Sequence, residues 1–453
     1  MKRIKLMLGA LLLTTSLTAC GGGADNGNNG GAAAPTTGNK ATNGGAAASG
    51  PVQIKFYTFK PDKEEEPYFQ AVKAFNESQD EVDVEYVSLV QNSDSVEFMT
   101  KLDVLMAGGE VVDVFQTGNE EMLVERAARG IVEPLDSFYE KAGLKPQDEY
   151  TKNPTLDGKT YGIIASATQW MTVFNKEHLD AAGLKLPEMG WTWDDFRDYA
   201  KKLTTKDHYG AYFHTWGEYP NLIAYTERPH PQLKEDLTPL FDDPSFEYFF
   251  NLRRAMETED KSVEPYADVL ASNYHVLQQF FAGEASMLTV PSYAVRAGLN
   301  LERFPHEFQM AYAPMPRSVD AKDVGYTNIS GSYLAMGAKS EKKDAAFTFM
   351  RWLSTEGAKY IQDFPGWKKA DGEALLNEFF GDQTSLIDIA SLSATLFDER
   401  NKMPENTITV PYGAELKTVV ENGFTKFMLD NEPFESVQKS MTEEAEKIVK
   451  ANQ

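Results

Sequence analysis

Three short β-rich stretches near the start of the globular part of this chain are separated by stretches with helical periodicity. The β-rich stretches are residues 54–59, 82–86 and 111–115. Between them, residues 64–79 and 96–106 place apolar side chains on one helical face. Strands that alternate with helices pair in parallel, because each helix returns the chain to the edge where the strand began. The pattern predicts an α/β fold in which ligands bind after Phe59, Leu89 and Phe115, where these strands end.

Further local patterns continue this mixture of helix and strand. A turn at Asp157-Gly158 precedes a predicted strand at 160–164, and a second strand is predicted at 171–174. Thr192 can cap a helix with Asp195 at its third position, while Trp191 packs on Phe196 as a hydrophobic staple. Residues 434–449 form a last amphipathic helix.

Composition limits the function classes that suit this chain. The formal net charge is −24, which argues against recognition of nucleic acids through a general positive field. The only cysteine is Cys20, and the six histidines show no metal-binding spacing, so neither a metal nor a cofactor is predicted. The sequence also lacks the motifs typical of serine hydrolases and nucleotide-binding proteins. From Pro51 onward the chain is too long for one typical core, which favours two domains.

The N-terminus has the pattern of a secretion signal that ends in a lipid attachment site. A basic start is followed by the short apolar run Leu6–Leu13 and then by small residues up to Cys20. This ending resembles the lipobox of bacterial lipoproteins, so residues 1–19 are expected to be removed and Cys20 to be lipidated. A soluble secreted protein with one stray cysteine is the alternative. Residues 20–50 are rich in Gly, Ala and Asn, and we expect them to form a flexible tether of about 30 Å.

Several segments resemble one known family. Asp157-Gly158-Lys159-Thr160-Tyr161-Gly162 is followed by Phe174-Asn175-Lys176, Ala181-Ala182-Gly183-Leu184 and Trp191-Thr192-Trp193. Further matches are Ala74-Phe75-Asn76, Gly109 with Asp113-Val114, Phe281–Met287 and Ala345–Leu353. In their order and spacing these segments resemble family 1 extracellular solute-binding proteins, the sugar-capturing lipoproteins of ABC importers. The chain departs from the family pattern at Lys60, Val112, Phe174 and Pro291-Ser292-Tyr293.

The resemblance implies a type II, maltose-binding-protein-like fold of two hinged α/β lobes with the ligand in the cleft between them. The expected boundaries are 51–165 plus 288–340 for the first lobe and 166–287 plus 341–453 for the second. The protein is then a monomer outside the cytoplasm, anchored to the bilayer through Cys20, that delivers a carbohydrate, an oligosaccharide, to the permease. The long tether favours a cell of the Gram-positive type. Hinge closure on the ligand is the expected motion.

A sugar-binding site needs flat aromatic surfaces and side chains that exchange hydrogen bonds with hydroxyl groups. Tyr293 stands where the family places its sugar-stacking tryptophan, which makes it the strongest candidate. The remaining candidates are Thr168, Gln169 and Trp170 before the 171–174 strand, Trp216 and Tyr219 on a loop, Trp367 between late helices, and Asn92, Asn119 and Glu120 after strands. For each aromatic residue packing in the core is the competing interpretation, and for each polar residue it is a solvated loop. Trp193, Phe349 and Trp352 are assigned to packing.

Two other interpretations stay open. The same fold can bind a peptide or a charged sugar acid, with Arg228, Arg296 or Arg317 in the cleft. A lipid-anchored carbohydrate-active enzyme is also compatible with the many carboxylates. The two carboxylates that catalyse glycoside hydrolysis are recognised by their separation in space, which a sequence does not show.

Overall fold

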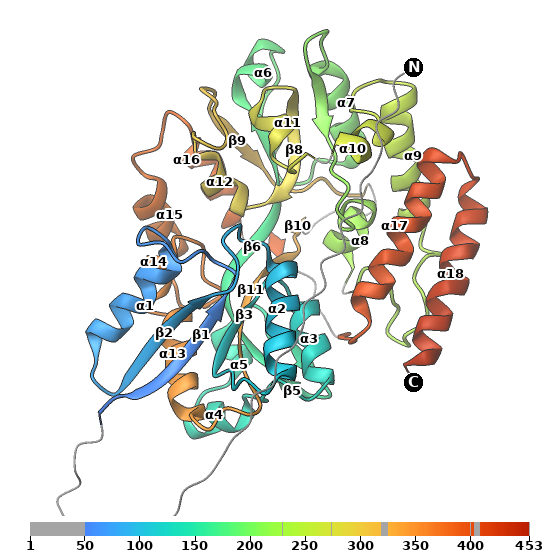
Figure 1. The fold of residues 1–453 in the computed structure, drawn as a ribbon. Helices are drawn as coiled ribbons and strands as arrows, with labels where there is room; N and C mark the ends of the chain where they lie inside the picture. The colour runs from blue at the N-terminus through green and yellow to red at the C-terminus, as the bar shows by residue number, and fades with distance from the viewer. Residues whose placement is uncertain are drawn as a thin grey trace, which may run out of the picture. The chain divides into compact units, whose positions relative to one another are not determined.

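An eight-stranded mixed sheet organises the chain (Figure 1). The computed structural model describes residues 50–228, 230–272, 274–318, 325–398, 400–402 and 408–452. Neighbouring strands follow the order β2-β1-β3-β11-β6-β8-β7, and β9 pairs with β6 beside this path. The predicted signal, Cys20 and nearly all of the tether lie outside the described residues.

The bounds of the elements are as follows. The strands are β1 (Val52–Thr58), β2 (Val82–Ser88), β3 (Val114–Thr117), β4 (Thr155–Leu156), β5 (Lys159–Thr160), β6 (Gly162–Asn175), β7 (Tyr209–Tyr212), β8 (Ala285–Pro291), β9 (Met310–Ala313), β10 (Gly325–Tyr326), β11 (Ile329–Met336) and β12 (Asn401–Lys402). The helices up to residue 300 are α1 (Pro67–Ser78), α2 (Ser95–Ala107), α3 (Glu120–Ala128), α4 (Asp136–Lys141), α5 (Pro146–Glu149), α6 (Lys176–Ala181), α7 (Trp193–Leu203), α8 (Leu222–Glu227), α9 (Pro244–Thr258), α10 (Tyr266–Ser272), α11 (Gln278–Phe281) and α12 (Tyr293–Gly298). The later helices are α13 (Lys343–Ser354), α14 (Ala358–Ile361), α15 (Gly372–Phe380), α16 (Ile389–Leu396), α17 (Gly413–Leu429) and α18 (Phe434–Ala451).

The predicted strand and helix alternation at the start of the chain is confirmed. β1 pairs in parallel with β2 on one side and with β3 on the other, and α1 and α2 connect them. β3 begins at Val114, three residues after the predicted start. At Asp113 the side chain accepts a hydrogen bond from the backbone N–H of Lys55 at 3.0 Å, in place of a main-chain ladder contact.

The two strands predicted at 160–164 and 171–174 largely merge into one long strand, β6. Its first half pairs antiparallel with β11, from Gly162 to Gln169, and its second half pairs with β8 and β9. The intervening polar residues resemble a loop in the sequence, but their backbone groups are taken up by β11. Close pairing depends on Gly331, because a Cβ atom there would lie 1.9 Å from the carbonyl oxygen of Ser166.

Two separate hydrophobic cores lie at the two ends of β6. One core contains apolar residues from 54–167 and 333–361, and we call the surrounding part lobe 1. The other contains residues from 170–315 and 376–449, and we call its surroundings lobe 2. The chain therefore crosses between the cores near residues 168, 316–332 and 362–375, and we call these three crossing segments the hinge.

The second and third crossings differ from the expected lobe boundaries at 287/288 and 340/341. Residues 288–291 belong to lobe 2 because β8 pairs with the second half of β6. Helix α13 belongs to lobe 1, where Phe349 packs edge-on against Phe56 with ring centroids 5.4 Å apart. The first crossing lies within a few residues of its expected place.

Local packing near the start of lobe 2 follows the sequence patterns. Thr192 and Asp195 form a complete capping box at the start of α7. Trp191 lies 5.8 Å from Phe196, as a hydrophobic staple requires, and Trp193 is fully buried. Among the described residues every helix is too short or too polar to span a bilayer.

Candidate ligand-binding cleft

A cavity of about 540 Å³ lies between the lobes, at the ends of β1 and β3. Lobe 1 contributes Lys60 after β1 and the start of α3, while lobe 2 contributes the loop after β7 and the start of α12. The hinge strands form its floor. The loops predicted to hold the ligand after the first and third strands therefore border this cavity, whereas the segment after the second strand reaches it only at Ser95 and Val96, where α2 begins.

Alternation along β6 decides which of its residues reach the cleft. Ser166, Thr168 and Trp170 line the cavity, whereas Ala167 and Gln169 do not. Successive side chains of a strand point to opposite faces, so every second residue is presented to the ligand. β11 contributes the consecutive residues 330–333, and Ser330 Oγ lies 3.0 Å from Thr168 Oγ1 across the two strands.

Six of the ten sequence-predicted binding residues line this cavity. They are Tyr293, Trp170, Trp216, Thr168, Asn119 and Glu120. Asn119 also caps α3, since its side-chain oxygen accepts the backbone N–H of Met122 at 2.9 Å. These placements bring the six together, and their contact with a ligand stays a prediction.

The other four predicted residues lie elsewhere. Tyr219 is a core residue that is 2% exposed, and its hydroxyl donates to the carbonyl of Thr289 at 2.7 Å. Asn92 is exposed on the loop before α2, where its side chain donates to Glu97 at 3.1 Å. Gln169 and Trp367 line a different pocket on the other face of the hinge.

Aromatic side chains from lobe 2 form one wall of the cleft. Trp216 is 37% exposed, and its backbone N–H donates to Nδ1 of His214 at 3.2 Å. Because Nδ1 accepts, the proton of His214 sits on Nε2, which donates to the carbonyl of Tyr274 at 3.1 Å. Burial lowers the pKa of His214, which keeps this neutral arrangement. Among the described residues the buried hydroxyl of Tyr293 has no hydrogen-bond partner.

Charged residues of lobe 1 line the facing wall, and two of them are paired with each other. Lys152 and Glu120 form an ion pair of 2.6 Å with both side chains about 13–14% exposed. Burial alone would lower the pKa of Lys152, but the charge of Glu120 raises it above its usual value. Beside the cavity, Lys417 of lobe 2 pairs with Glu218 at 2.7 Å. Burial opposes ionisation of Glu121, yet Lys417 and Lys152 hold its pKa below the usual range.

Lys60 stands apart from these pairs. Its ammonium lies 5.0 Å from the ring centroid of Phe59 and 5.6 Å from that of Tyr68. Among the described residues no carboxylate oxygen lies within ion-pair distance of its Nζ. Burial lowers the pKa of Lys60, and burial likewise raises the pKa of the nearby Asp363 carboxyl.

A buried chain of hydrogen bonds holds the Lys60 backbone in place. The N–H of Lys60 donates to Thr58 Oγ1 at 3.1 Å, and Thr58 donates to Gln116 Oε1 at 2.6 Å. Gln116 Nε2 in turn donates to Ser332 Oγ at 3.0 Å, and Tyr68 Oη lies 3.2 Å from the same oxygen. This series of hydrogen bonds links the end of β1 to the hinge strand β11 and holds the polar floor of the cleft in place.

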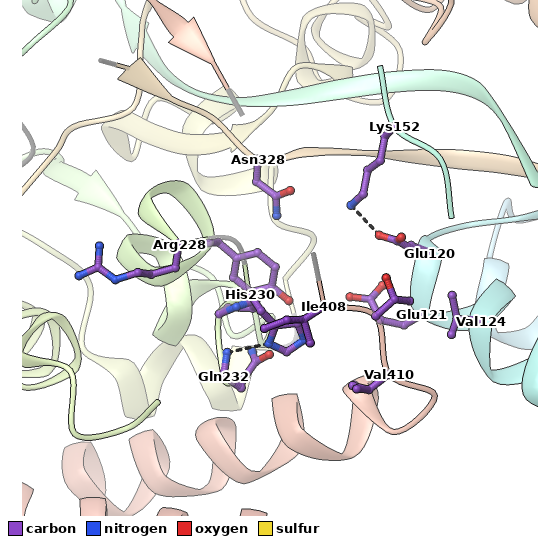
Figure 2. Close-up of a pocket in the computed structure, with 14 residues that line it drawn as sticks. Glu120, Glu121, Val124, Lys152, Arg228, His230, Gln232, Asn328, Ile408 and Val410 are labelled. Atoms are coloured by element: carbon purple, nitrogen blue, oxygen red, sulfur yellow. Dashed lines mark hydrogen bonds and ion pairs between the residues drawn. The ribbon is translucent and has the colours of Figure 1, made fainter. Parts of the chain in front are cut away.

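A smaller polar pocket opens beside the cleft and shares Glu120, Glu121, Lys152, Tyr225 and Asn328 with it. Figure 2 shows the glutamates facing His230 and Gln232 across this pocket, whereas the Arg228 side chain points away from them.

The partners of these residues explain their orientations. His230 Nδ1 accepts the backbone N–H groups of Gln232 and Leu233 at 3.2 and 3.1 Å, and burial lowers its pKa to about 4. Arg228 pairs with Asp243 at 2.9 Å. Arg228 therefore lines only the side pocket, and neither Arg296 nor Arg317 is among the described residues that line the cleft.

Several cleft residues were not predicted as site residues. Ser166, Ser330 and Ser332 follow the period-two pattern of the hinge strands, so the sequence carried a usable signal for them. In the sequence, Lys60 stands out only as a departure from the family pattern. Others come from loops and helix ends that are distant in sequence, among them Lys152, Glu121, Glu218, Tyr225, Asn328 and Asp363. In the described part of the chain no group of three or more His, Asp or Glu side chains is placed to hold a metal ion.

Comparison with known proteins supports one family. Residues 60–360 match the model of the bacterial extracellular solute-binding proteins. A curated relative, the sn-glycerol-3-phosphate-binding periplasmic protein UgpB of Escherichia coli K12, is 22% identical over 262 residues, which are 54% of this chain and 57% of that protein. The chain thus spans little more than half the length of the curated relatives it matches.

Solved structures share the fold at low sequence identity. An ABC substrate-binding protein of Listeria monocytogenes in complex with cycloalternan has a TM-score of 0.69 at 21% identity, covering 88% of this chain and 99% of that one. The sugar-binding protein MalE of Xanthomonas citri has a TM-score of 0.65 at 18% identity, covering 88% and 98%. These likenesses show the hinged two-lobe α/β fold. Since the family match covers well over half of its length, the chain belongs to the bacterial extracellular solute-binding proteins.

Proposed function

We propose that this protein is the substrate-binding component of an ABC importer and captures a neutral carbohydrate, an oligosaccharide, between its lobes. The observation that carries the proposal is the composition of the cleft. Aromatic rings of lobe 2 face hydroxyl and carboxylate groups of lobe 1 across a cavity of about 540 Å³. A pyranose has apolar C–H faces and a belt of hydroxyl groups, so it matches both walls.

The pairing of charges favours a neutral ligand. Glu120 and Glu218 are each held by a lysine at 2.6 and 2.7 Å, so their charges are compensated within the protein. Their remaining lone pairs can still accept hydrogen bonds from sugar hydroxyls. At Glu120 and Glu218 a carbohydrate would therefore gain directional hydrogen bonds without burying an unpaired charge.

The lobes are expected to close on the ligand because each lobe supplies one wall of the cleft. A ligand shifts the open and closed states only by its difference in affinity for them. A sugar that touches Trp216 in lobe 2 and Glu120 in lobe 1 makes both contacts only when the lobes are close. The closed complex is then what the permease receives.

A thermal-shift screen of monosaccharides and oligosaccharides tests the ligand class, because a ligand that binds only the folded state raises the melting temperature. We expect stabilisation by at least one neutral oligosaccharide. If only peptides or acidic solutes stabilise the protein, the carbohydrate assignment is wrong.

Binding without chemical conversion is the second part of the proposal. After overnight incubation of the stabilising sugar with excess protein, mass spectrometry should recover it intact. The appearance of shorter saccharides would instead identify a carbohydrate-active enzyme.

A second candidate ligand is an anionic polyol, which the unpaired Lys60 favours. The curated relative UgpB is named for binding sn-glycerol-3-phosphate, and this chain is similar to it over part of its length. Such a ligand would place its anionic group against the Lys60 ammonium. The affinity for such a ligand would fall as the salt concentration rises, and Lys60→Met would lower it further at any one salt concentration. Binding of a neutral sugar would show little salt dependence.

We also propose that Cys20 anchors the protein to the outer face of the cell membrane and that it acts there as a monomer. Two acyl chains hold a protein stably at a bilayer. In cells, Cys20→Ser should move the protein from the membrane fraction to the soluble fraction. Retention of the variant in the membrane would show that the anchor lies elsewhere.

A further inference from the structure

We propose a second binding site on the face of the hinge opposite the cleft, suited to a small, flat, uncharged aromatic molecule. This back pocket has a volume of about 220 Å³. Its walls include Phe364, Trp367 and Phe397, and Gln169 and Ser292 supply polar groups.

The alternation of the hinge strands separates the two sites. Along β6, Ser166, Thr168 and Trp170 line the cleft, while Ala167 and Gln169 line the back pocket. Neighbouring side chains of a strand point to opposite faces, so the two cavities lie on opposite sides of the same strand.

The same division recurs on two other segments. On β11, Ile329 lines the back pocket and Ser330 lines the cleft. Where β8 ends and α12 begins, Ser292 lines the back pocket, whereas Pro291 and Tyr293 line the cleft. The back pocket is therefore a separate site and no extension of the cleft.

The chemistry of the back pocket differs from that of the cleft. Its lining residues include no carboxylate, and the only charged one, Lys368, is exposed and donates to the carbonyl of Gln147 at 2.7 Å. Trp367 and Phe364 present apolar surface that suits a flat ring.

The Gln169 amide is only loosely engaged within the protein. Its Nε2 is 3.4 Å from the carbonyl of Leu396, and its Oε1 is 3.4 Å from Asn401 Nδ2. Both contacts are long, so an incoming N–H or O–H group can compete for the amide oxygen. The site thus fits an aromatic ring with one hydrogen-bond donor.

All three hinge segments border the back pocket. Gln169 lies on β6, Ile329 begins β11, and Phe364 and Trp367 lie on the third crossing. Phe364 also meets Phe397 edge-on, with ring centroids 6.0 Å apart, so the pocket joins the third crossing to lobe 2. Movement of the lobes about the hinge must change the walls of this pocket. A molecule bound there is then coupled to ligand binding in the cleft, and the coupling is reciprocal.

Indole serves as the probe, because it is flat, uncharged and carries one N–H donor. Ligand-observed NMR with the full chain, without any sugar, should detect saturable binding. Ala370→Leu fills the back pocket, since Ala370 is part of its lining, and should abolish the binding. Ala394→Leu, the same change at an exposed position of α16, should leave it unchanged. Absence of saturable binding, or loss of binding in Trp216→Ala instead of Ala370→Leu, would overturn the proposal.

The coupling is tested separately and rests on the proposed function. With the cleft saturated by the sugar that the thermal-shift screen identifies, the Kd of indole should change at least threefold. An unchanged Kd would refute the coupling even where indole binds the back pocket. A screen that finds no sugar would contradict the proposed function and leave the sugar-free binding experiment unaffected.

Discussion

The two lobes face one cleft with different chemistry. Lobe 1 contributes mainly charged and hydroxyl groups, such as Lys60, Glu120 and Lys152, and lobe 2 contributes mainly aromatic rings. The lobes differ again in their titrating groups, because all six histidines lie between residues 178 and 306, within lobe 2. The difference indicates that stacking on lobe 2 and hydrogen bonding to lobe 1 are separable contributions to binding, and that acid affects lobe 2 first.

The largest expected effect comes from removing the exposed ring of lobe 2. Trp216→Ala should weaken binding of the carbohydrate roughly 30-fold, which corresponds to about 2 kcal/mol for a buried aromatic contact. Isothermal titration calorimetry measures the loss. Tyr360→Ala is the control, since Tyr360 lies on α14 and lines neither the cleft nor the back pocket, and it should change the sugar affinity less than about threefold. Equal losses in the two variants would contradict the assignment of the cleft.

The next effect comes from the ion pair on the lobe 1 wall. Glu120→Gln leaves Lys152 poorly solvated without its partner, so the free energy of unfolding should fall by about 2 kcal/mol. Urea denaturation measures this change. Glu97→Gln removes an exposed pair of similar length, Lys101 to Glu97 at 2.8 Å, and should leave the urea midpoint nearly unchanged.

A double variant shows whether the effect belongs to the pair. Glu120→Gln with Lys152→Met removes both charges and should recover much of the stability lost in Glu120→Gln alone. A double variant less stable than the single one would show that Lys152 has another role in the fold.

Acid should destabilise the protein through lobe 2. Burial lowers the pKa of His230 to about 4, and burial with nearby positive charge does the same for His178 and His275. These values lie below that of an unfolded histidine, about 6.5, so the folded state binds fewer protons. The stabilising contribution is complete above pH of about 6.5 and is lost as the pH falls through about 4.

Two measurements test this pH dependence. Between pH 7 and pH 5, hydrogen exchange corrected for intrinsic rates should accelerate in lobe 2 peptides before lobe 1 peptides. His230→Asn keeps an oxygen that can accept the two backbone N–H groups and does not titrate, so its urea midpoint should fall less over this range. Simultaneous loss of protection in both lobes would refute the localisation.

The smallest effect is expected at Asn92. Its side chain is exposed and bonded to Glu97, outside the cleft, so Asn92→Ala should leave sugar affinity within about twofold of the parent protein. A tenfold loss would instead show that the ligand contacts the loop after β2, outside the cleft.

Much of the fold was predictable because its signals are local. The parallel strands β1 to β3 and the capping box of α7 depend on residues close in sequence. The continuity of β6 depends on pairing with β11, more than 150 residues away, and a polar stretch such as Thr168-Gln169 gives no local sign of it. The lobe boundaries depend on such distant pairings as well.

The candidate site was predictable only in part for the same reason. Thr168 and Trp170 were chosen from family position, and the strand alternation that places them in the cleft also places Gln169 behind it. Lys152 lines the cleft with its ammonium paired to Glu120, which lies on another element. Lys60, a departure from the family pattern, lies in the cleft itself.

A crystal structure of the protein with the carbohydrate found by the screen would show directly whether the ligand lies between the lobes. We expect a sugar ring against Trp216 or Tyr293 of lobe 2, with its hydroxyls bonded to Glu120 or other polar groups of lobe 1. A sugar that contacts one lobe only, or that occupies the face of the hinge behind β6, would contradict this expectation.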